Sequence, residues 1–266
     1  MNKRVMILLF YCIFIHVTHA FCFHEYNLDK ICNRDLWYLT TSSDRKENLG
    51  WNHITVEDCL YKKERAKRIV NKIYSKLLLP WPFKEKTFMT GIEVYVTRNG
   101  VQLYKIARTD VDGKDKKEKW SVERDGNNYT YTSINSKGKV SVKKLNASFF
   151  DRLQIEGILQ DSSTYKQGWE EKVRIYNPVR DKVTEVFNFF DSKKKVKIDS
   201  YELTVTVLKS KVDTGNSEIW LDEKGIMIYS VIRGSKYGIR FSAMTELSPK
   251  NQVETIFPES TGIKFY

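Results

Sequence analysis

The chain has 266 residues, 29% of them charged and 41% hydrophobic, and its 45 Lys and Arg against 33 Asp and Glu give a formal net charge of +12. This length allows one large domain, or one domain with an appendage. Lysines are mixed with acidic residues, as over Gly113–Lys119, and no nucleic-acid-binding motif accompanies them. The composition therefore argues against nucleic acid as a partner. It indicates a solvated surface or attraction to an anionic component of a cell envelope.

Residues 1–20 are expected to form a signal peptide. Lys3 and Arg4 precede an apolar run, Val5–Val17, and small residues before and at Ala20 suit cleavage after that position. The run is shorter than the roughly 18 residues that a membrane-spanning helix needs, so no transmembrane span is predicted. The mature chain, with a net charge of +10 after loss of the two basic residues, is expected to be exported and periplasmic or secreted.

Three cysteines remain after the predicted cleavage: Cys22, Cys32 and Cys59. Disulfides persist in exported proteins, and an odd number leaves one thiol unpaired. We expect a Cys32–Cys59 disulfide, with Cys22 free.

Residues 21–85 are predicted to form a cover segment that contains one helix. Residues 21–52 have no sustained period, whereas Thr55–Leu78 has apolar residues at helical spacings. These are Cys59, Ala66, Val70, Ile73 and Leu77. Pro80 and Pro82 prevent continuation. This basic amphipathic helix is expected either to pack on a β domain with a solvated basic face or to contact a membrane surface.

From residue 86 the pattern changes to the two-residue period of β-strands. Strands are predicted over Ile92–Val96, Val101–Ala107, Trp120–Arg124, Tyr129–Ile134, Lys139–Lys144, Gly168–Tyr176, Lys182–Phe190, Lys195–Asp199, Tyr201–Leu208 and three segments of Ser217–Leu247. Turns are predicted at Asp222–Gly225 and Arg233–Lys236. The predicted fold is mainly β: a curved antiparallel meander over 86–247, forming a half-barrel or open barrel, with one N-terminal amphipathic helix and an irregular tail over 248–266.

No arrangement typical of an enzyme is found. Only His24 and His53 remain after cleavage, and the chain lacks HExxH, CxxC, G-x-S-x-G and Gly-rich phosphate-loop motifs. The adjacent acids Glu170–Glu171 and Asp222–Glu223 are best explained as surface charge. We therefore expect a non-catalytic protein without a metal or cofactor.

Aromatic residues on predicted strands are the candidate ligand-binding residues. Either they fill a β core, or they line a concave apolar face that holds an acyl chain. The candidates are Trp120, Trp169, Trp220, Tyr229 and Phe241.

Two segments resemble a family of uncharacterised bacterial periplasmic domains, grouped as a domain of unknown function. They are the hairpin Gly91–Val101 and the W-x-D-x-x-G turn formed by Trp220, Asp222 and Gly225. The resemblance covers residues 91–247 and implies a distant similarity to the half-barrels of lipoprotein carriers, which shield acyl chains on a concave side. It supplies no catalytic residues.

Three functions are weighed. The first is a carrier of a hydrophobic ligand, lipid or envelope component on the concave face. The second is a secreted interaction protein whose basic and aromatic outer surface binds a protein partner. The third is an envelope-glycan hydrolase, which needs two carboxylates about 5–10 Å apart in a cleft.

Overall fold

The computed structural model describes residues 27–77, 86–111, 116–126, 128–146, 152–153, 165–198, 201–212, 215–236 and 239–258. The predicted signal peptide and Cys22 lie outside these residues. The described chain is almost entirely β-structure.

One sheet of 15 strands contains all the described β-structure, in the order β8-β7-β6-β5-β4-β3-β2-β1-β15-β14-β13-β12-β11-β10-β9. The strands are β1 (Arg34–Ser42), β2 (Asn48–Tyr61), β3 (Glu64–Leu77), β4 (Lys86–Thr97), β5 (Gly100–Asp110), β6 (Lys116–Asp125), β7 (Asn128–Ile134), β8 (Val140–Asn146), β9 (Arg152–Leu153), β10 (Glu170–Asn177), β11 (Lys182–Ile198), β12 (Tyr201–Val212), β13 (Gly215–Leu221), β14 (Met227–Lys236) and β15 (Ile239–Leu247).

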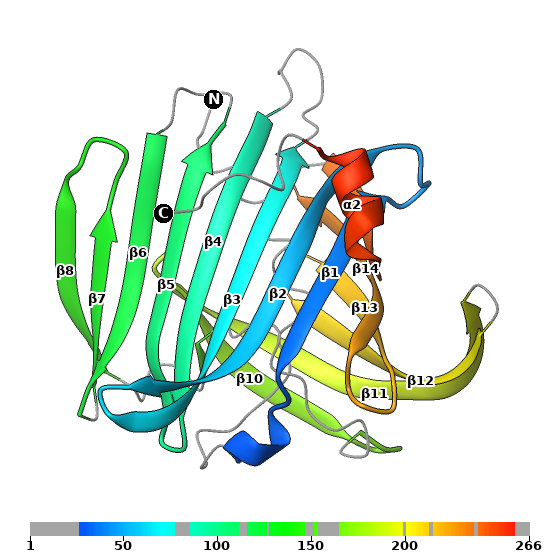
Figure 1. Ribbon diagram of the computed structural model, residues 1–266, viewed down its shortest axis with the longest axis horizontal. Coiled ribbons are helices and arrows are strands. Elements are labelled where there is room, and N and C mark those ends of the chain that lie inside the picture. The colour runs from blue at the N-terminus through cyan, green and yellow to red at the C-terminus, as the bar shows by residue number, and fades with distance from the viewer. Residues whose placement is uncertain are drawn as a thin grey trace.

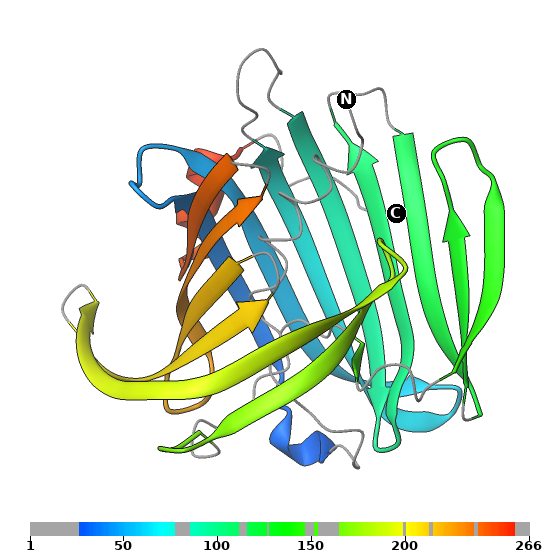
Figure 2. The same ribbon diagram turned by 180° about the vertical axis from the view of Figure 1, so that it is seen from behind.

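Neighbouring strands are antiparallel except β9 and β10, which are parallel. The sheet bends back on itself, so that β1–β8 form one layer and β9–β15 form a second layer behind it (Figure 1). Seen from behind, β11 and β12 cross the strands of the first layer at a steep angle (Figure 2). The two layers meet where β1 pairs with β15. This confirms the prediction of a mainly β fold built on a curved antiparallel sheet. The sheet is open, because its two end strands, β8 and β9, are not hydrogen-bonded to each other.

The helix predicted over Thr55–Leu78 is wrong, because this segment forms the hairpin β2–β3. Lys62 and Lys63 make the two-residue turn, with positive φ angles of 49° and 72°. Such turns require positive φ at both central positions, which Gly and Asn usually supply. Lys62 and Lys63 are neither Gly nor Asn, so the sequence does not indicate a turn at this position. No helix in the described ranges is long and apolar enough to cross a membrane.

Two smaller expectations also differ from the structure. Arg233–Lys236 is not a turn: Arg233 pairs with Ser242, and Lys236 with Ile239, in the β14–β15 ladder. The segment after Leu247 is not wholly irregular, because α2 (Lys250–Ile256) follows Pro249. The turn at Asp222–Gly225 is confirmed. Gly225 has a φ of 72° and its N–H donates to the carbonyl of Asp222 at 3.0 Å.

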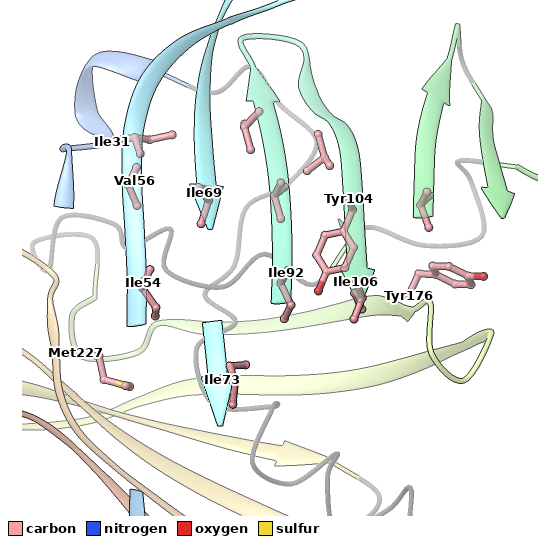
Figure 3. Packing of buried hydrophobic residues seen from close by; sticks show 14 of the residues in the cluster. Ile31, Ile54, Val56, Ile69, Ile73, Ile92, Tyr104, Ile106, Tyr176 and Met227 are labelled. Carbon is pink, nitrogen blue, oxygen red and sulfur yellow. The ribbon is translucent and has the colours of Figure 1, made fainter. Parts of the chain in front are cut away.

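The main core lies between the two layers. Alternate residues of β2–β6, such as Ile54, Ile92 and Ile106, face Met227 of β14 and Tyr176 of β10 (Figure 3). The face of the sheet that carries this core is called the concave face below, and its opposite is called the outer face. The short 3-10 helix η2 (Leu28–Lys30) adds Leu28 to the same core.

A second cluster lies on the outer face. Trp51 of β2 is 1% exposed and lies 5.4 Å from Trp37 and 6.4 Å from Tyr74, measured between ring centroids. Val253 of α2 and Phe257 complete the cluster. The C-terminal helix therefore covers the outer face over β1 and β2, as Figure 1 shows.

Side-chain contacts join the β10–β11 hairpin to distant strands of the sheet. The tip of the β10–β11 hairpin reaches β7 and β8, where Tyr131 donates to the carbonyl of Pro178 at 3.1 Å and Lys143 pairs with Asp181. Tyr176 also donates to Asp181, at 2.7 Å, and burial with this carboxylate raises the pKa of Tyr176. These contacts hold the two layers together without a continuous ladder.

Candidate functional site: the concave face

A band of small polar side chains crosses the concave face where apolar residues are expected. One row of the ladder runs from Ser230 through Thr245, Thr40 and Gly50 to Ser75. The next row of the first layer contains Asn52 and Thr90. We call the following residues the polar belt: Thr40, Asn52, Ser75, Thr90, Ser230 and Thr245.

Every side chain of the polar belt is buried, with 7% exposure or less. Thr40 and Thr245 hydrogen-bond each other across 3.1 Å. In contrast, Asn52 Oδ1, Thr90 Oγ1 and Ser230 Oγ have no hydrogen-bond partner among the described residues. A buried polar atom without a partner costs about 1–3 kcal/mol, so each of these three atoms marks a position where a water or a ligand group would be stabilised.

Arg108 lies beside the polar belt, opposite Thr90 in the β4–β5 ladder. Its guanidinium pairs with Glu118 and lies 5.6 Å from the ring centroid of Phe88 and 5.3 Å from that of Trp120. Lys86 and Asp110, 3.7 Å apart, form a second ion pair on the adjacent row. Each of these two cations is therefore paired with a carboxylate at this end of the concave face.

The aromatic candidates whose side chains are described lie on two different faces of the sheet. Trp120 and Trp169 are partly buried and pack against the core between the layers. Trp169 contacts Tyr165 edge-on at 4.7 Å, and its carbonyl accepts from the N–H of Phe190 at 2.9 Å. These two tryptophans therefore lie on the concave side of the sheet.

Trp220 and Tyr229 belong to a different cluster, with Val205 and Val207. They stack at 4.4 Å across β13 and β14, and Lys194 Nζ lies 3.6 Å from the Trp220 ring centroid. Ile219 and Leu221, the chain neighbours of Trp220, face the core, so alternation places the tryptophan on the outer face. Phe241 pairs with Gly234 in the ladder, and its side chain lies outside the described part of the structure.

Partly buried apolar side chains border the concave core on several strands. We call them the apolar margin of the core. The residues are Leu36, Trp120, Leu145, Trp169, Val179, Val183, Phe190 and Ile226.

The polar belt was missed by the sequence analysis. The available signal was an interruption of the apolar alternation, because Asn52 precedes Ile54 and Val56 on the same face of β2, and Thr90 precedes Ile92 on β4. On β2 the two-residue period is hidden, because the apolar residues from Thr55 onward have the spacing of a helix.

The predicted Cys32–Cys59 disulfide is wrong, because both cysteines are free thiols. Cys32 is exposed beyond η2, whereas Cys59 is half-buried on β2. The predicted disulfide was expected to tie the N-terminal segment to a helix that carries Cys59, whereas Cys59 lies on the strand β2.

Alkylation should distinguish the two thiols. Burial raises the pKa of the Cys59 thiol, so less of it is thiolate at a given pH, and thiolate is the nucleophile. We expect iodoacetamide at pH 8 to label Cys32 well before Cys59, and labelling of Cys59 to increase as the pH rises. Peptide mass mapping over time measures this, and equal rates for the two residues would contradict it.

The described residues contain no group of three or more His, Cys, Asp or Glu that could hold a metal ion. His53 lies 2.7 Å from Asp35 and stacks on Trp37 at 4.0 Å between ring centroids. Burial lowers its pKa. Asp222 Oδ1 accepts from the N–H of Ile226 at 2.7 Å and so holds the turn.

A pair of matched substitutions tests which hydroxyl groups of the polar belt have a hydrogen-bond partner. Thr90→Val removes a buried hydroxyl that has no partner and keeps the side-chain shape, so we expect unfolding free energy to rise by about 1 kcal/mol. Thr40→Val leaves the hydroxyl of Thr245 without its partner, so we expect a loss of about 1–3 kcal/mol. Urea unfolding of both variants measures the difference, and the same sign for both would contradict the assignment.

No family model and no curated protein sequence matches this chain. Its fold is similar to the crystal structure of a β-barrel-like protein of the domain of unknown function DUF1849 from Brucella abortus. The TM-score is 0.55 and the identity 10%, over 82% of this chain and 96% of that chain. At this identity the likeness concerns the fold alone. It agrees with the resemblance to uncharacterised bacterial domains with a barrel-like fold.

Proposed function

We propose that the protein binds an amphipathic ligand on its concave face, without chemistry on that ligand. The observation that carries this proposal is the set of unpartnered polar atoms of Asn52, Thr90 and Ser230 on the face that carries the main apolar core. A protein stabilised only by packing would gain from apolar residues at these positions. Polar side chains at these positions lower the stability of the fold, and such a loss is expected where a residue serves binding.

The charges near the polar belt indicate the polar group of the ligand. Arg108 and Lys86 are each paired with a carboxylate, so an anionic group would have to compete with these carboxylates for the two cations. Hydroxyl and amide groups of the belt suit a neutral head that both donates and accepts hydrogen bonds. We therefore assign a lipid-like ligand with an uncharged hydroxyl-bearing head, such as a monoacylglycerol.

The apolar part of the ligand would lie along the apolar margin. The base of the core is closely packed, with Val94, Val96 and Val122 fully buried, and leaves the tail no place there. Trp120, by contrast, is partly exposed beside the polar belt and next to Arg108. A tail on this margin would exclude water from the indole, which changes its fluorescence.

Titration with monoolein tests the proposal, with oleate as the charged comparison and tryptophan emission as the readout. Wild-type protein is expected to show a saturable change with monoolein at lower concentration than with oleate. The change should be lost in Trp120→Phe and kept in Trp220→Phe, because the second tryptophan lies on the outer face. A change that persists in Trp120→Phe and disappears in Trp220→Phe would overturn the concave assignment.

The outer-surface interaction and glycan-hydrolase alternatives have weaker support at these sites. Trp220 on the outer face already has its indole N–H bonded to Glu218 at 2.6 Å and Lys194 above its ring. The neighbouring acids Glu170 and Glu171 lie on opposite faces of β10 by alternation. The interaction surface that the structure supports better is a different one, at the edge of the sheet.

A further inference from the structure

The strand β8 ends the sheet beside β7, and within the described sheet no strand lies on its other side. An edge strand presents unpaired N–H and C=O groups that can pair with another chain. The opposite end of the sheet has β9, which is two residues long. Short edges offer little to pair with, whereas β8 has seven residues and spans about 23 Å. The two edges are therefore unequal, and β8 is the one able to accept a strand.

Two apolar side chains of β8 are open to solvent. Val140 is 56% exposed and Val142 is 61% exposed. They occupy alternate positions and therefore share one face of the strand. Lys143, between Val142 and the end of the strand, points the other way and pairs with Asp181 on the concave side. The valines thus lie on the outer face, where a strand added beside β8 would place its own side chains next to them.

The residues of β8 and of the segments next to it in the chain carry only positive charge, and the nearby Asp181 of the β10–β11 hairpin is paired with Lys143. From Gly126 to Phe150 the chain has four lysines and no acidic residue. Lys137, Lys139 and Lys144 are exposed and have no ion-pair partner within the described residues. A strand with alternating apolar and acidic residues would match both the valines and the lysines.

We propose that β8 is a docking edge for an extended acidic segment of another protein, which adds to the sheet as an antiparallel or parallel strand. Main-chain hydrogen bonds would provide affinity, and contacts with Val140 and Val142 would provide specificity. A second copy of this chain is a poorer occupant, because pairing two β8 strands would gather both lysine sets with no acid between them. The edge lies apart from the polar belt, so this proposal does not depend on the concave ligand.

A synthetic peptide of alternating glutamate and valine, equal in length to β8, is the probe. Hydrogen–deuterium exchange of the full chain should show slower exchange of the Val140–Asn146 amides when the peptide is present. Fluorescence anisotropy of the labelled peptide should show weaker binding as salt concentration rises. A peptide of alternating lysine and valine should not bind.

Variants locate the contact. The double variant Val140→Glu, Val142→Glu replaces exposed side chains and should fold, and it should bind the acidic peptide at least about tenfold more weakly, because it loses the apolar contacts and repels the glutamates. Leu60→Glu is the matched control, because Leu60 is 73% exposed on β2, and it should bind as the wild type does. Equal binding by the double variant, or unchanged exchange of β8, would overturn the proposal. A concentration-dependent dimer that is lost in the double variant would also overturn it, in favour of a second copy.

Discussion

Alanine at Gly50 is expected to lower the unfolding free energy by about 3 kcal/mol or more, and so to remove much of the stability of a typical domain. A Cβ at this position would lie 2.0 Å from the carbonyl oxygen of Tyr74 and 2.9 Å from its carbonyl carbon. These are backbone atoms of the neighbouring strand β3, so no side-chain rotation can relieve the contact. The strands β2 and β3 would have to separate in the middle of the sheet, next to Thr40 and Ser75 of the polar belt.

Gly138→Ala is the matched control for this prediction. Gly138 has a φ of 76°, and a Cβ there would meet nothing within 4 Å. Its substitution costs only the backbone strain of a positive φ, about 1–2 kcal/mol. Urea unfolding of the two variants should therefore show a much larger loss for Gly50→Ala. Comparable losses would show that the close approach of β2 and β3 is not what requires glycine at position 50.

Truncation of Trp51 is the second large effect. Trp51→Ala is expected to cost about 3–5 kcal/mol, because it removes a fully buried indole from the cluster under α2. Its ring stacks with Tyr74, which in turn contacts Phe257 at 5.3 Å between ring centroids. Loss of the indole should therefore also loosen α2, and the Lys250–Ile256 amides should exchange faster with solvent than in the wild type.

Trp220→Ala provides the comparison. Trp220 is only partly buried on the outer face, so its truncation should cost less and leave exchange of the α2 amides unchanged. A Trp51→Ala protein that unfolds like the wild type, or whose α2 amides keep their protection, would contradict the packing described here.

The strands from residue 86 onward could be predicted because most have one buried and one more exposed face. Ile92, Val94 and Val96 alternate with partly exposed Glu93 and Tyr95, so the two-residue period is clear. Turns with Gly at a required position, as at Gly225, were also readable from the sequence.

The segment before residue 86 could not be predicted, for two physical reasons. Both faces of β3 are buried in places, since Ile69 faces the core and Val70 is also only 7% exposed. Apolar residues on two faces then occur at mixed spacings that imitate a helical stripe. The turn at Lys62 and Lys63 has the geometry of a Gly or Asn turn without those residues, so nothing in the sequence separated the two strands.

The faces of the candidate aromatic residues could be predicted only in part. Trp120 and Trp169 pack against the core on the concave side. Trp220 lies on the outer face, because Ile219 and Leu221 on either side of it face the core. A register shift between β13 and β14 places Met227 in the core and Tyr229 in the outer cluster, although they are two residues apart, and the sequence does not reveal this bulge. Asn52 and Thr90 could not be recognised as site residues from the sequence, because a polar residue in a strand pattern normally indicates an exposed position, whereas both are buried here.

Native mass spectrometry of the protein, purified without detergent, tests the central claim most directly. The comparison is between the wild type and the belt variant Asn52→Leu, Thr90→Val, Ser230→Ala. We predict that the wild type carries an additional mass of a neutral amphipathic lipid, released on denaturation, and that the belt variant lacks this mass while unfolding at an equal or higher urea concentration. A wild type without bound lipid, or a belt variant that keeps the same lipid, would contradict the claim that the polar belt is a binding site.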